Sequence, residues 1–253
     1  MDERIGYKAI IQATMDKEQQ STEDKHMEAI VITGAGTGLG KQLALKYAKK
    51  GHPIILMGRR EHPLFAVKQE IEANEGQAFI YTLDIRSYED VCQVSAQIIQ
   101  QHKIRCLINN AGIGHFGSLA SLTCEQIHEM IETNVCGTIY MTKAFLPYFQ
   151  TLPKAKIINI ISTAGLRGKV NESVYAATKF AVRGFTESLV KELENTPISI
   201  TAVYMGGMDT PFWEGTDHIQ DRSRLLPPEQ IAEYIIQNEN GQAEMIIESN
   251  KLL

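Results

Sequence analysis

The sequence has few of the features that mark membrane, secreted or metal-binding proteins. Its 253 residues include no apolar run of about 18 residues, so no membrane-spanning helix is predicted. The polar N-terminus lacks the apolar segment of a signal peptide. The cysteines form no CxxC pair, which favours reduced thiols over disulfides or a zinc site; they are Cys92, Cys106, Cys124 and Cys136. We therefore expect a cytoplasmic protein with no membrane association and no bound metal.

An excess of positive charge is also missing. The chain has 25 Lys and Arg against 30 Asp and Glu, a formal net charge of −5. Nucleic-acid binding relies on clustered Lys and Arg, so a nucleic-acid partner is not expected. Residues 16–26 (DKEQQSTEDKH) are charged and have no apolar stripe. We predict a polar N-terminal extension over residues 1–27, unless translation starts at Met27, and one domain over residues 28–253.

Short apolar runs alternate with helical patterns from residue 28 onward. Strands are predicted at 29–33, 54–57, 78–83, 104–108, 156–161, 199–204 and 245–247. Helices are predicted near 61–75, 87–102, 123–149, 173–195 and 228–238, and in a first helix whose Leu39, Leu43 and Tyr47 share one face. Continuous apolar runs suit strands covered on both faces. This order predicts a doubly wound α/β fold, with a mostly parallel sheet of about seven strands between two helix layers.

A glycine-rich segment, residues 33–40 (TGAGTGLG), joins the first predicted strand to the first predicted helix. Glycines allow a tight turn there, and the unpaired N–H groups of a helix N-terminus can hold a pyrophosphate. Glycines also occur in purely structural turns, but a strand before and a helix after are the context that phosphate binding requires. We therefore predict a dinucleotide site at this turn.

The charge that follows the second predicted strand bears on which dinucleotide binds. An acidic residue about 20 positions after the glycine turn usually contacts the ribose 2′-hydroxyl of NAD. Here Gly58 is followed by Arg59 and Arg60 instead. A guanidinium can pair with a 2′-phosphate, so the sequence favours NADP(H) over NAD(H). The alternative is that both arginines only solvate the strand end.

Polar side chains also stand at the start of one predicted helix and directly after two predicted strands. Tyr175 and Lys179 are four residues apart, so both lie on one face of the predicted helix. An ammonium beside a phenol lowers the pKa of the phenol, which could then exchange a proton with a carbonyl or alcohol oxygen. Ser162 and the segment 109–112 (NNAG) follow strands at the sheet edge where ligands bind in open α/β folds.

Together these motifs resemble the short-chain dehydrogenase/reductase family. Residues 33–40 are similar to its TGxxxGxG turn, residues 109–112 to its NNAG motif, and Tyr175 with Lys179 to its YxxxK pair. Ser162 stands thirteen residues before Tyr175, as is usual there. The similarity runs from Glu28 to the C-terminus. It implies a single-domain Rossmann fold and a homodimer or homotetramer.

The resemblance also implies a role for each matching residue. Tyr175 would be the acid/base, Ser162 would bind the reacting oxygen, Lys179 would hold the nicotinamide ribose, and Asn134 would anchor a proton-relay water. Asp84 would contact the adenine. The cofactor-binding residues would be Gly34, Gly36, Thr37, Gly38, Leu39, Gly40, Arg59, Asp84, Ile85, Asn110, Ala111, Gly112, Tyr175, Lys179, Gly206 and Thr210.

The sequence departs from the family pattern in two places. Met205 replaces a proline before Gly206, so the turn loses that restriction on φ, although Thr210 is kept. Thr37 stands where many NADP-preferring members carry a basic residue, which leaves the NADP assignment on Arg59. Residues 206–226 would form a substrate lid. Its aromatic and leucine side chains either line a pocket or pin the loop to the body; they are Phe212, Trp213, Leu225 and Leu226.

Two functional hypotheses follow. The first is an NADP(H)-dependent oxidoreductase that interconverts a carbonyl and a secondary alcohol on a small organic substrate. The second is a non-catalytic NADP(H)-binding sensor or partner-binding protein, motivated by the N-terminal extension and the altered turn at Met205. His115 and Arg167 lie near the motifs and could contact substrate or only solvent. Substrate identity depends on lid side chains and stays open.

Overall fold

Parallel strands form the centre of the protein, in a computed structural model that describes residues 27–248. Within that range seven strands make one sheet in the order β3-β2-β1-β4-β5-β6-β7, and every neighbouring pair is parallel. They are β1 (Ala29–Thr33), β2 (Ile54–Gly58), β3 (Ala78–Thr82), β4 (Ile104–Asn109), β5 (Ala155–Ile160), β6 (Ile198–Met205) and β7 (Glu244–Ile247). The predicted α/β fold with a seven-stranded sheet is confirmed.

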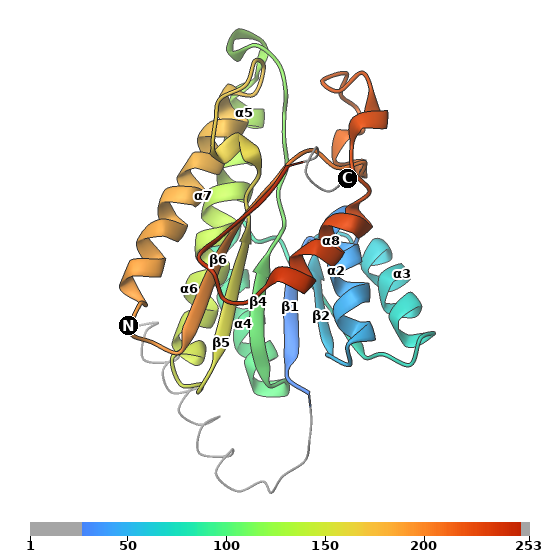
Figure 1. The fold of residues 1–253 in the computed structure, drawn as a ribbon, viewed down its shortest axis with the longest axis vertical. Coiled ribbons are helices and arrows are strands. Elements are labelled where there is room, and N and C mark those ends of the chain that lie inside the picture. The colour runs from blue at the N-terminus through green and yellow to red at the C-terminus, as the bar shows by residue number, and fades with distance from the viewer. Residues whose placement is uncertain (1–26, 249–253) are drawn as a thin grey trace, which may run out of the picture.

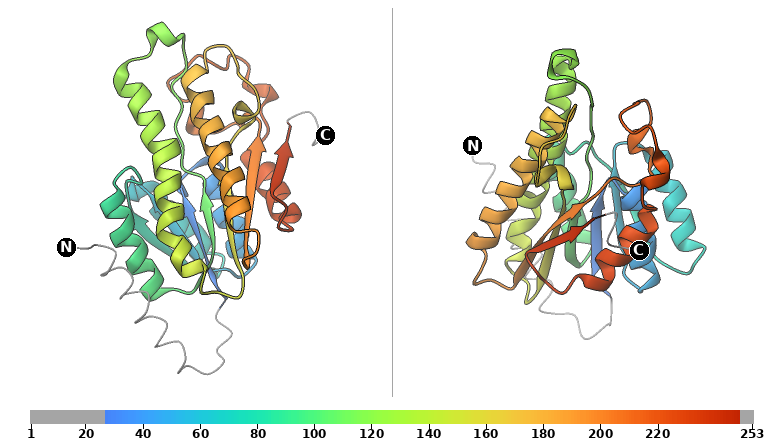
Figure 2. Two further views of the ribbon diagram at one scale, coloured as in Figure 1. Left: turned by 90° about the vertical axis from the view of Figure 1, so that its left-hand side faces the viewer. Right: turned by 45° about the horizontal axis from the view of Figure 1, so that its top comes forward.

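Helices cover both faces of the sheet (Figures 1 and 2). One layer holds α2 (Gly38–Lys49), α3 (Glu61–Glu72) and α8 (Pro228–Asn238). The other holds α4 (Tyr88–Gln101), α6 (Gly137–Phe149) and α7 (Ser173–Glu192), with α5 (Cys124–Met130) at the end of α6. Because each strand is covered on both faces, the strands read as continuous apolar runs, as the sequence indicated.

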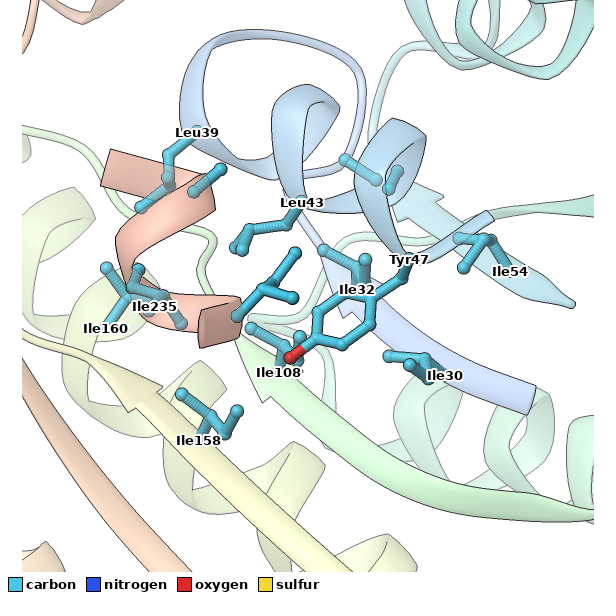
Figure 3. Close-up of a cluster of buried hydrophobic side chains, with 14 of the residues drawn as sticks. Ile30, Ile32, Leu39, Leu43, Tyr47, Ile54, Ile108, Ile158, Ile160 and Ile235 are labelled. Carbon is cyan, nitrogen blue, oxygen red and sulfur yellow. The ribbon is translucent and has the colours of Figure 1, made fainter. Parts of the chain in front are cut away.

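The apolar face of α2 fills the space between the sheet and α8. Leu39, Leu43 and Tyr47 recur at a spacing of four, and all three are buried against strand residues and Ile235 of α8 (Figure 3). Phe145 and Phe149 of α6 are fully buried in the opposite layer. The apolar helix faces that the periodicity predicted therefore pack against the sheet in both layers.

The predicted helix 123–149 differs from the observed structure in its middle. The segment consists of α5, a π-helical turn at Ile131–Cys136 and α6. A π turn inserts an extra residue per turn and re-aims the side chains within it. The apolar pattern continues through the insertion, which is why the sequence predicted one uninterrupted helix.

Two predictions about the ends of the chain fall largely outside the described range. The extension 1–27 lies there except for Met27, so the division into an extension and a domain over 28–253 stays a prediction. No helix within residues 27–248 has both the length and the apolar character needed to cross a membrane.

The strand order positions the site. The chain leaves β1 toward β2 and β3, then returns to the other side of β1 with β4. Open α/β sheets bind ligands where the order reverses, outside the carboxyl ends of the strands. Here that point lies between β1 and β4, where the glycine turn and the NNAG segment both begin.

Candidate active site

The glycine turn holds the end of β1 close to the end of β4. Gly34 has a φ of 66°, and a Cβ there would come within 2.9 Å of the Cα of Ala111. A Cβ on Gly40 would lie 2.2 Å from the carbonyl oxygen of Gly34. A side chain at Gly34 would push the end of β1 away from the segment after β4, and a side chain at Gly40 would push the start of α2 away from the end of β1. These glycines are therefore required for the turn itself, whatever binds to it.

Thr33 and Asn110 fasten the two strand ends together. The Thr33 Oγ1 accepts hydrogen bonds from the backbone N–H groups of Asn110 and Ala111, each at 3.0 Å. In return, the Asn110 Nδ2 donates to the carbonyl oxygens of Thr33 at 2.9 Å and Gly34 at 3.2 Å. The NNAG segment thus acts as a clamp that fixes one wall of the site.

Ser162 follows β5 in an unusual backbone conformation. Its φ is 146° and its ψ is 155°, a region that residues other than glycine seldom occupy. Its Oγ accepts a hydrogen bond from the N–H of Ala164 at 3.1 Å, which holds the side chain in place. A side-chain hydrogen bond with Ser162 also lowers the pKa of Tyr175. Strain of this kind persists at sites where a side chain must point in one direction.

Tyr175 and Lys179 are both buried on α7, with the Lys179 Nζ 5.6 Å from the centre of the Tyr175 ring. Burial raises the pKa of Tyr175 above its ordinary value, and Glu172 raises it further, against the lowering by Ser162. Burial also lowers the pKa of Lys179 to about 8. The lowered pKa expected for Tyr175 is therefore not found, because a buried site disfavours the charged form of both groups.

Asn134 is positioned by the π-helical turn. Its side chain is 1% exposed and bonds both backbone groups of Ile113, accepting from the N–H and donating to the carbonyl oxygen at 2.9 Å each. Its Nδ2 also donates to the Thr178 Oγ1 at 3.0 Å. A Cβ on Gly112 would lie 3.3 Å from the Asn134 Oδ1 and 3.5 Å from the Lys179 Nζ. Asn134 thus ties the segment after β4 to the helix that carries Tyr175.

One cavity of about 830 Å³ connects most of the predicted residues. It is lined by Gly34, Gly36, Thr37, Gly38, Leu39, Arg59, Asp84, Ile85, Asn110, Ala111, Gly112, Ser162, Tyr175, Lys179, Gly206 and Thr210. Gly40 and Asn134 are absent from the lining, since Gly40 packs behind the turn and Asn134 lies behind Ile113. The cavity runs from the glycine turn to the Tyr175 hydroxyl side of the site.

The end of the cavity near β2 and β3 carries mixed charge. Arg59 lines it together with Asp84 and lowers the pKa of that carboxyl from a distance. The main cause of the low pKa of Asp84 is Arg86, which the sequence analysis missed and whose Nη2 donates to the Asp84 Oδ2 at 2.7 Å. Arg86 stands two residues after Asp84, and this short spacing was the feature of the sequence from which the ion pair could have been predicted.

The lid loop (residues 206–226) closes the other end with aromatic side chains. Phe212 and Trp213 line the cavity, so the pocket-lining alternative holds for both, and Trp213 is also pinned because its Nε1 donates to the Met208 carbonyl oxygen at 2.8 Å. Leu225 lines the cavity, whereas Leu226 is buried in the core.

His115 and Arg167, for which the sequence allowed contact with either substrate or solvent, lie in different positions. His115 lines the cavity, and its Nε2 lies 3.1 Å from the Glu129 Oε2. Arg167 is absent from the lining, and its side chain is 66% exposed. Arg167 therefore matches the solvated alternative, while His115 faces the site.

Glu172 and His218 are cavity residues that the sequence analysis did not single out. Glu172 directly precedes α7 and its side chain is 5% exposed. His218 comes from the lid loop, and its Nε2 lies 2.8 Å from the Glu172 Oε1. Neither residue belongs to a spacing pattern, so nothing in the sequence brings the two together.

No group of three or more His, Cys, Asp or Glu side chains suited to a metal ion occurs among residues 27–248. The polar groups that line the cavity are backbone amides, hydroxyls, one side-chain amide, two lysine amines, two arginine guanidiniums, two histidine rings and four carboxylates. The backbone amides and the cationic side chains among them can hold a phosphate-bearing organic ligand.

Known proteins are similar to this chain in sequence and in fold. The sequence profile of the short chain dehydrogenase family matches residues 28–220. YxnA, an uncharacterized oxidoreductase of Bacillus subtilis, is 34% identical over 220 residues, which span 83% of this chain and 62% of the relative. A sepiapterin reductase of Chlorobaculum tepidum is 31% identical over 221 residues, 84% of this chain and 89% of the reductase.

A solved structure is similar to this chain in fold. An alcohol dehydrogenase from the archaeon Thermococcus sibiricus, complexed with 5-hydroxy-NADP, has a TM-score of 0.79 and 25% identity, covering 87% of this chain and 95% of that one. The family match covers most of the sequence, and the sheet order and the motifs at its carboxyl edge fit the same assignment. The chain is therefore an oxidoreductase of the short-chain dehydrogenase/reductase family.

Proposed function

We propose that the protein interconverts a carbonyl and a secondary alcohol on a small organic substrate, with NADP(H) as its cofactor. The observation that carries the proposal is the cavity that joins the glycine turn to Ser162, Tyr175 and Lys179. A dinucleotide needs a phosphate cradle and an oxidoreductase needs a proton donor, and both lie along the same walls. Membership of an oxidoreductase family weighs against the non-catalytic alternative.

The residues present fit a nicotinamide dinucleotide. Gly36 lines the cavity, and a Cβ there would meet the Pro63 Cβ at 2.9 Å, so glycine allows the turn to pack closely against the start of α3. The start of α2 offers free N–H groups and a partial positive charge to the pyrophosphate. Lys179 would hold the nicotinamide ribose, and Asp84 and Ile85 would border the adenine.

The cofactor, when bound, supplies or accepts a hydride at the substrate carbon. Ser162 and Tyr175 would hold the substrate oxygen between their hydroxyl groups, where negative charge develops during reduction. Tyr175 would then pass its proton to that oxygen, because burial keeps the phenol in its protonated form. Asn134 would keep the Ile113 segment in place beside Lys179.

Arg59 supports NADP(H) over NAD(H). It lines the cavity where the strand after the glycine turn ends, and no acidic residue occupies that strand end. The Thermococcus sibiricus relative of known structure was solved with an NADP derivative. A guanidinium there would pair with the 2′-phosphate in a charge-assisted contact, whereas a free 2′-hydroxyl would offer only a weaker neutral hydrogen bond.

The first prediction tests the proton donor. With a panel of ketones and aldehydes and NADPH, the wild-type protein should oxidise NADPH. Tyr175→Phe should lower kcat by at least about a hundredfold, because the step loses its general acid. NADPH binding, followed by quenching of protein fluorescence, should change less than about threefold. Unchanged turnover in this variant would refute the role of Tyr175.

A further inference from the structure

Glu172 occupies an unusual place for a carboxylate. It lies at the cavity wall immediately before α7, three residues before Tyr175, and its side chain is 5% exposed. Buried carboxylates are costly unless they are paired. Its Oε1 lies 2.8 Å from the His218 Nε2 and 3.9 Å from the Lys169 Nζ. Of these two partners, His218 is the closer and belongs to the lid loop.

His218 is held from a second direction by aromatic stacking. Its ring lies parallel to that of Phe116, with ring centres 4.5 Å apart and planes 10° apart. Phe116 in turn stacks on Trp213 and meets the edge of Tyr175, with ring centres at 5.1 Å and 5.4 Å. The histidine therefore joins the lid, the segment after β4 and the start of α7 at one point.

We propose that Glu172 and His218 are positioning residues that form a latch, which fastens the lid loop over Tyr175 through a single hydrogen bond. The inference rests on the proposed function, since it assigns a closing device to the same site. The lid begins at Gly206 and contributes Phe212 and Trp213 to the cavity. Closure of the lid would exclude water from the reacting oxygen and would shape the part of the cavity that receives the substrate.

The latch also affects the proton donor. Burial is the main cause of the raised pKa of Tyr175, Ser162 partly offsets it, and the charge of Glu172 raises it further. The titratable groups facing Glu172 are Lys169 and His218, and Lys179 faces Tyr175 on its own helix. A carboxylate at this position thus fastens the lid and adds a smaller contribution to the effect of burial on the phenol.

The test uses Trp213, which is the one tryptophan of the chain and lies next to the latch. Three variants of the full chain separate the contributions. His218→Phe keeps a stacking ring and removes the hydrogen bond. Glu172→Gln keeps an acceptor and removes the charge. Asp217→Asn removes the same charge from an exposed neighbour of His218 in the lid, and serves as the matched control.

We expect His218→Phe to shift Trp213 emission to longer wavelength and to increase its quenching by acrylamide. The same variant should raise the KM for the carbonyl substrate about tenfold, which is the scale of a lost hydrogen bond to a charged group, with a smaller change in kcat. Asp217→Asn should match the wild type in both measurements. Glu172→Gln should keep wild-type emission, because the amide oxygen still accepts from the histidine N–H.

Wild-type emission and KM in His218→Phe would overturn the latch, and so would an equal effect of Asp217→Asn. A red-shifted emission in Glu172→Gln would overturn the assignment of the latch to the hydrogen bond. The emission measurements need neither NADPH nor turnover. Absence of turnover in the wild-type protein would therefore refute the proposed function while the latch is still tested on its own.

Discussion

The phenol of Tyr175 lies in a site that disfavours charge on either member of the tyrosine–lysine pair. Burial raises the pKa of Tyr175 and lowers that of Lys179 to about 8. Near neutral pH the phenol is protonated, and the amine still carries its proton. That protonation state suits the donation of a proton to an oxygen that gains negative charge, which is the reductive direction of the proposed reaction.

A charge reversal at Arg59 tests the cofactor preference. Arg59→Asp should raise the KM for NADPH about thirtyfold, because a charge-assisted contact to the 2′-phosphate is lost and a repulsion replaces it. The KM for NADH should change less than about threefold. Steady-state kinetics with both cofactors measure the ratio.

Arg60→Asp provides the comparison, because Arg60 is the adjacent arginine and also lines the cavity. We expect a smaller effect of Arg60→Asp on the KM for NADPH. Equal losses with NADPH and NADH in Arg59→Asp would show that Arg59 does not read the 2′-phosphate.

Residue identity and spacing were enough to locate Ser162, Tyr175 and Lys179, because these positions follow from strand ends and from one helical turn. The same reasoning gave the wrong direction for the pKa of Tyr175. Spacing shows which groups are neighbours, whereas the depth at which they are buried depends on the whole fold. Glu172 and His218 could not be paired from the sequence, since they meet only through the path of the lid loop.

At the scale of elements, the site depends on how β1 and β4 are joined at their ends. Thr33 accepts two backbone hydrogen bonds from the segment after β4, so one hydroxyl sets the spacing of the two strand ends. The sequence carried a signal for this residue, a hydroxyl-bearing side chain between a buried strand and a glycine turn. Its partners could be identified only after β1 and β4 were known to be neighbours.

Removing that hydroxyl should weaken both the fold and the cofactor site. Thr33→Val leaves two N–H groups without their acceptor, so the free energy of unfolding should fall by about 2 kcal/mol in urea titrations. The KM for NADPH should rise as the cavity wall loosens. Thr82→Val, at the exposed end of β3, should leave both quantities near their wild-type values. A fully stable Thr33→Val protein would mean that the clamp depends on Asn110 alone.

The π-helical turn between α5 and α6 shows a limit of periodicity. The apolar pattern of residues 123–149 predicts one uninterrupted helix. The extra residue of the π turn rotates the apolar face of the helix but leaves no gap in the pattern. The turn is nevertheless where Asn134 reaches Ile113 and Thr178. Such turns recur at functional sites, which fits the position of this asparagine behind the cavity wall.

At the scale of the whole molecule, the two helix layers and the sheet could be predicted because parallel strands and crossover helices leave a repeating apolar pattern. The strand order could not be derived from that pattern, since each strand is apolar on both faces. The expected homodimer or homotetramer stays a prediction. It rests on the resemblance to the family.

The core between α2, α8 and the sheet should dominate stability. Leu43 is fully buried there (Figure 3), so Leu43→Ala should lower the free energy of unfolding by about 3 kcal/mol through lost burial and a residual cavity. Leu119→Ala, at a side chain that is 62% exposed, should change it by less than about 0.5 kcal/mol. Urea denaturation at constant protein concentration measures both. Similar losses in the two variants would contradict the assignment of this core.

The central position of β1 has a consequence for synthesis. The hydroxyl contact from Thr33 to Ile108 joins positions 75 residues apart, and β4 is synthesised only after β1, β2 and β3. Until then one long edge of the nascent sheet has no partner, and unpaired edges invite association with other unfinished chains. Slowing translation just before residue 104 should therefore lower the yield of native protein, and chaperones that shield nascent strands should restore it.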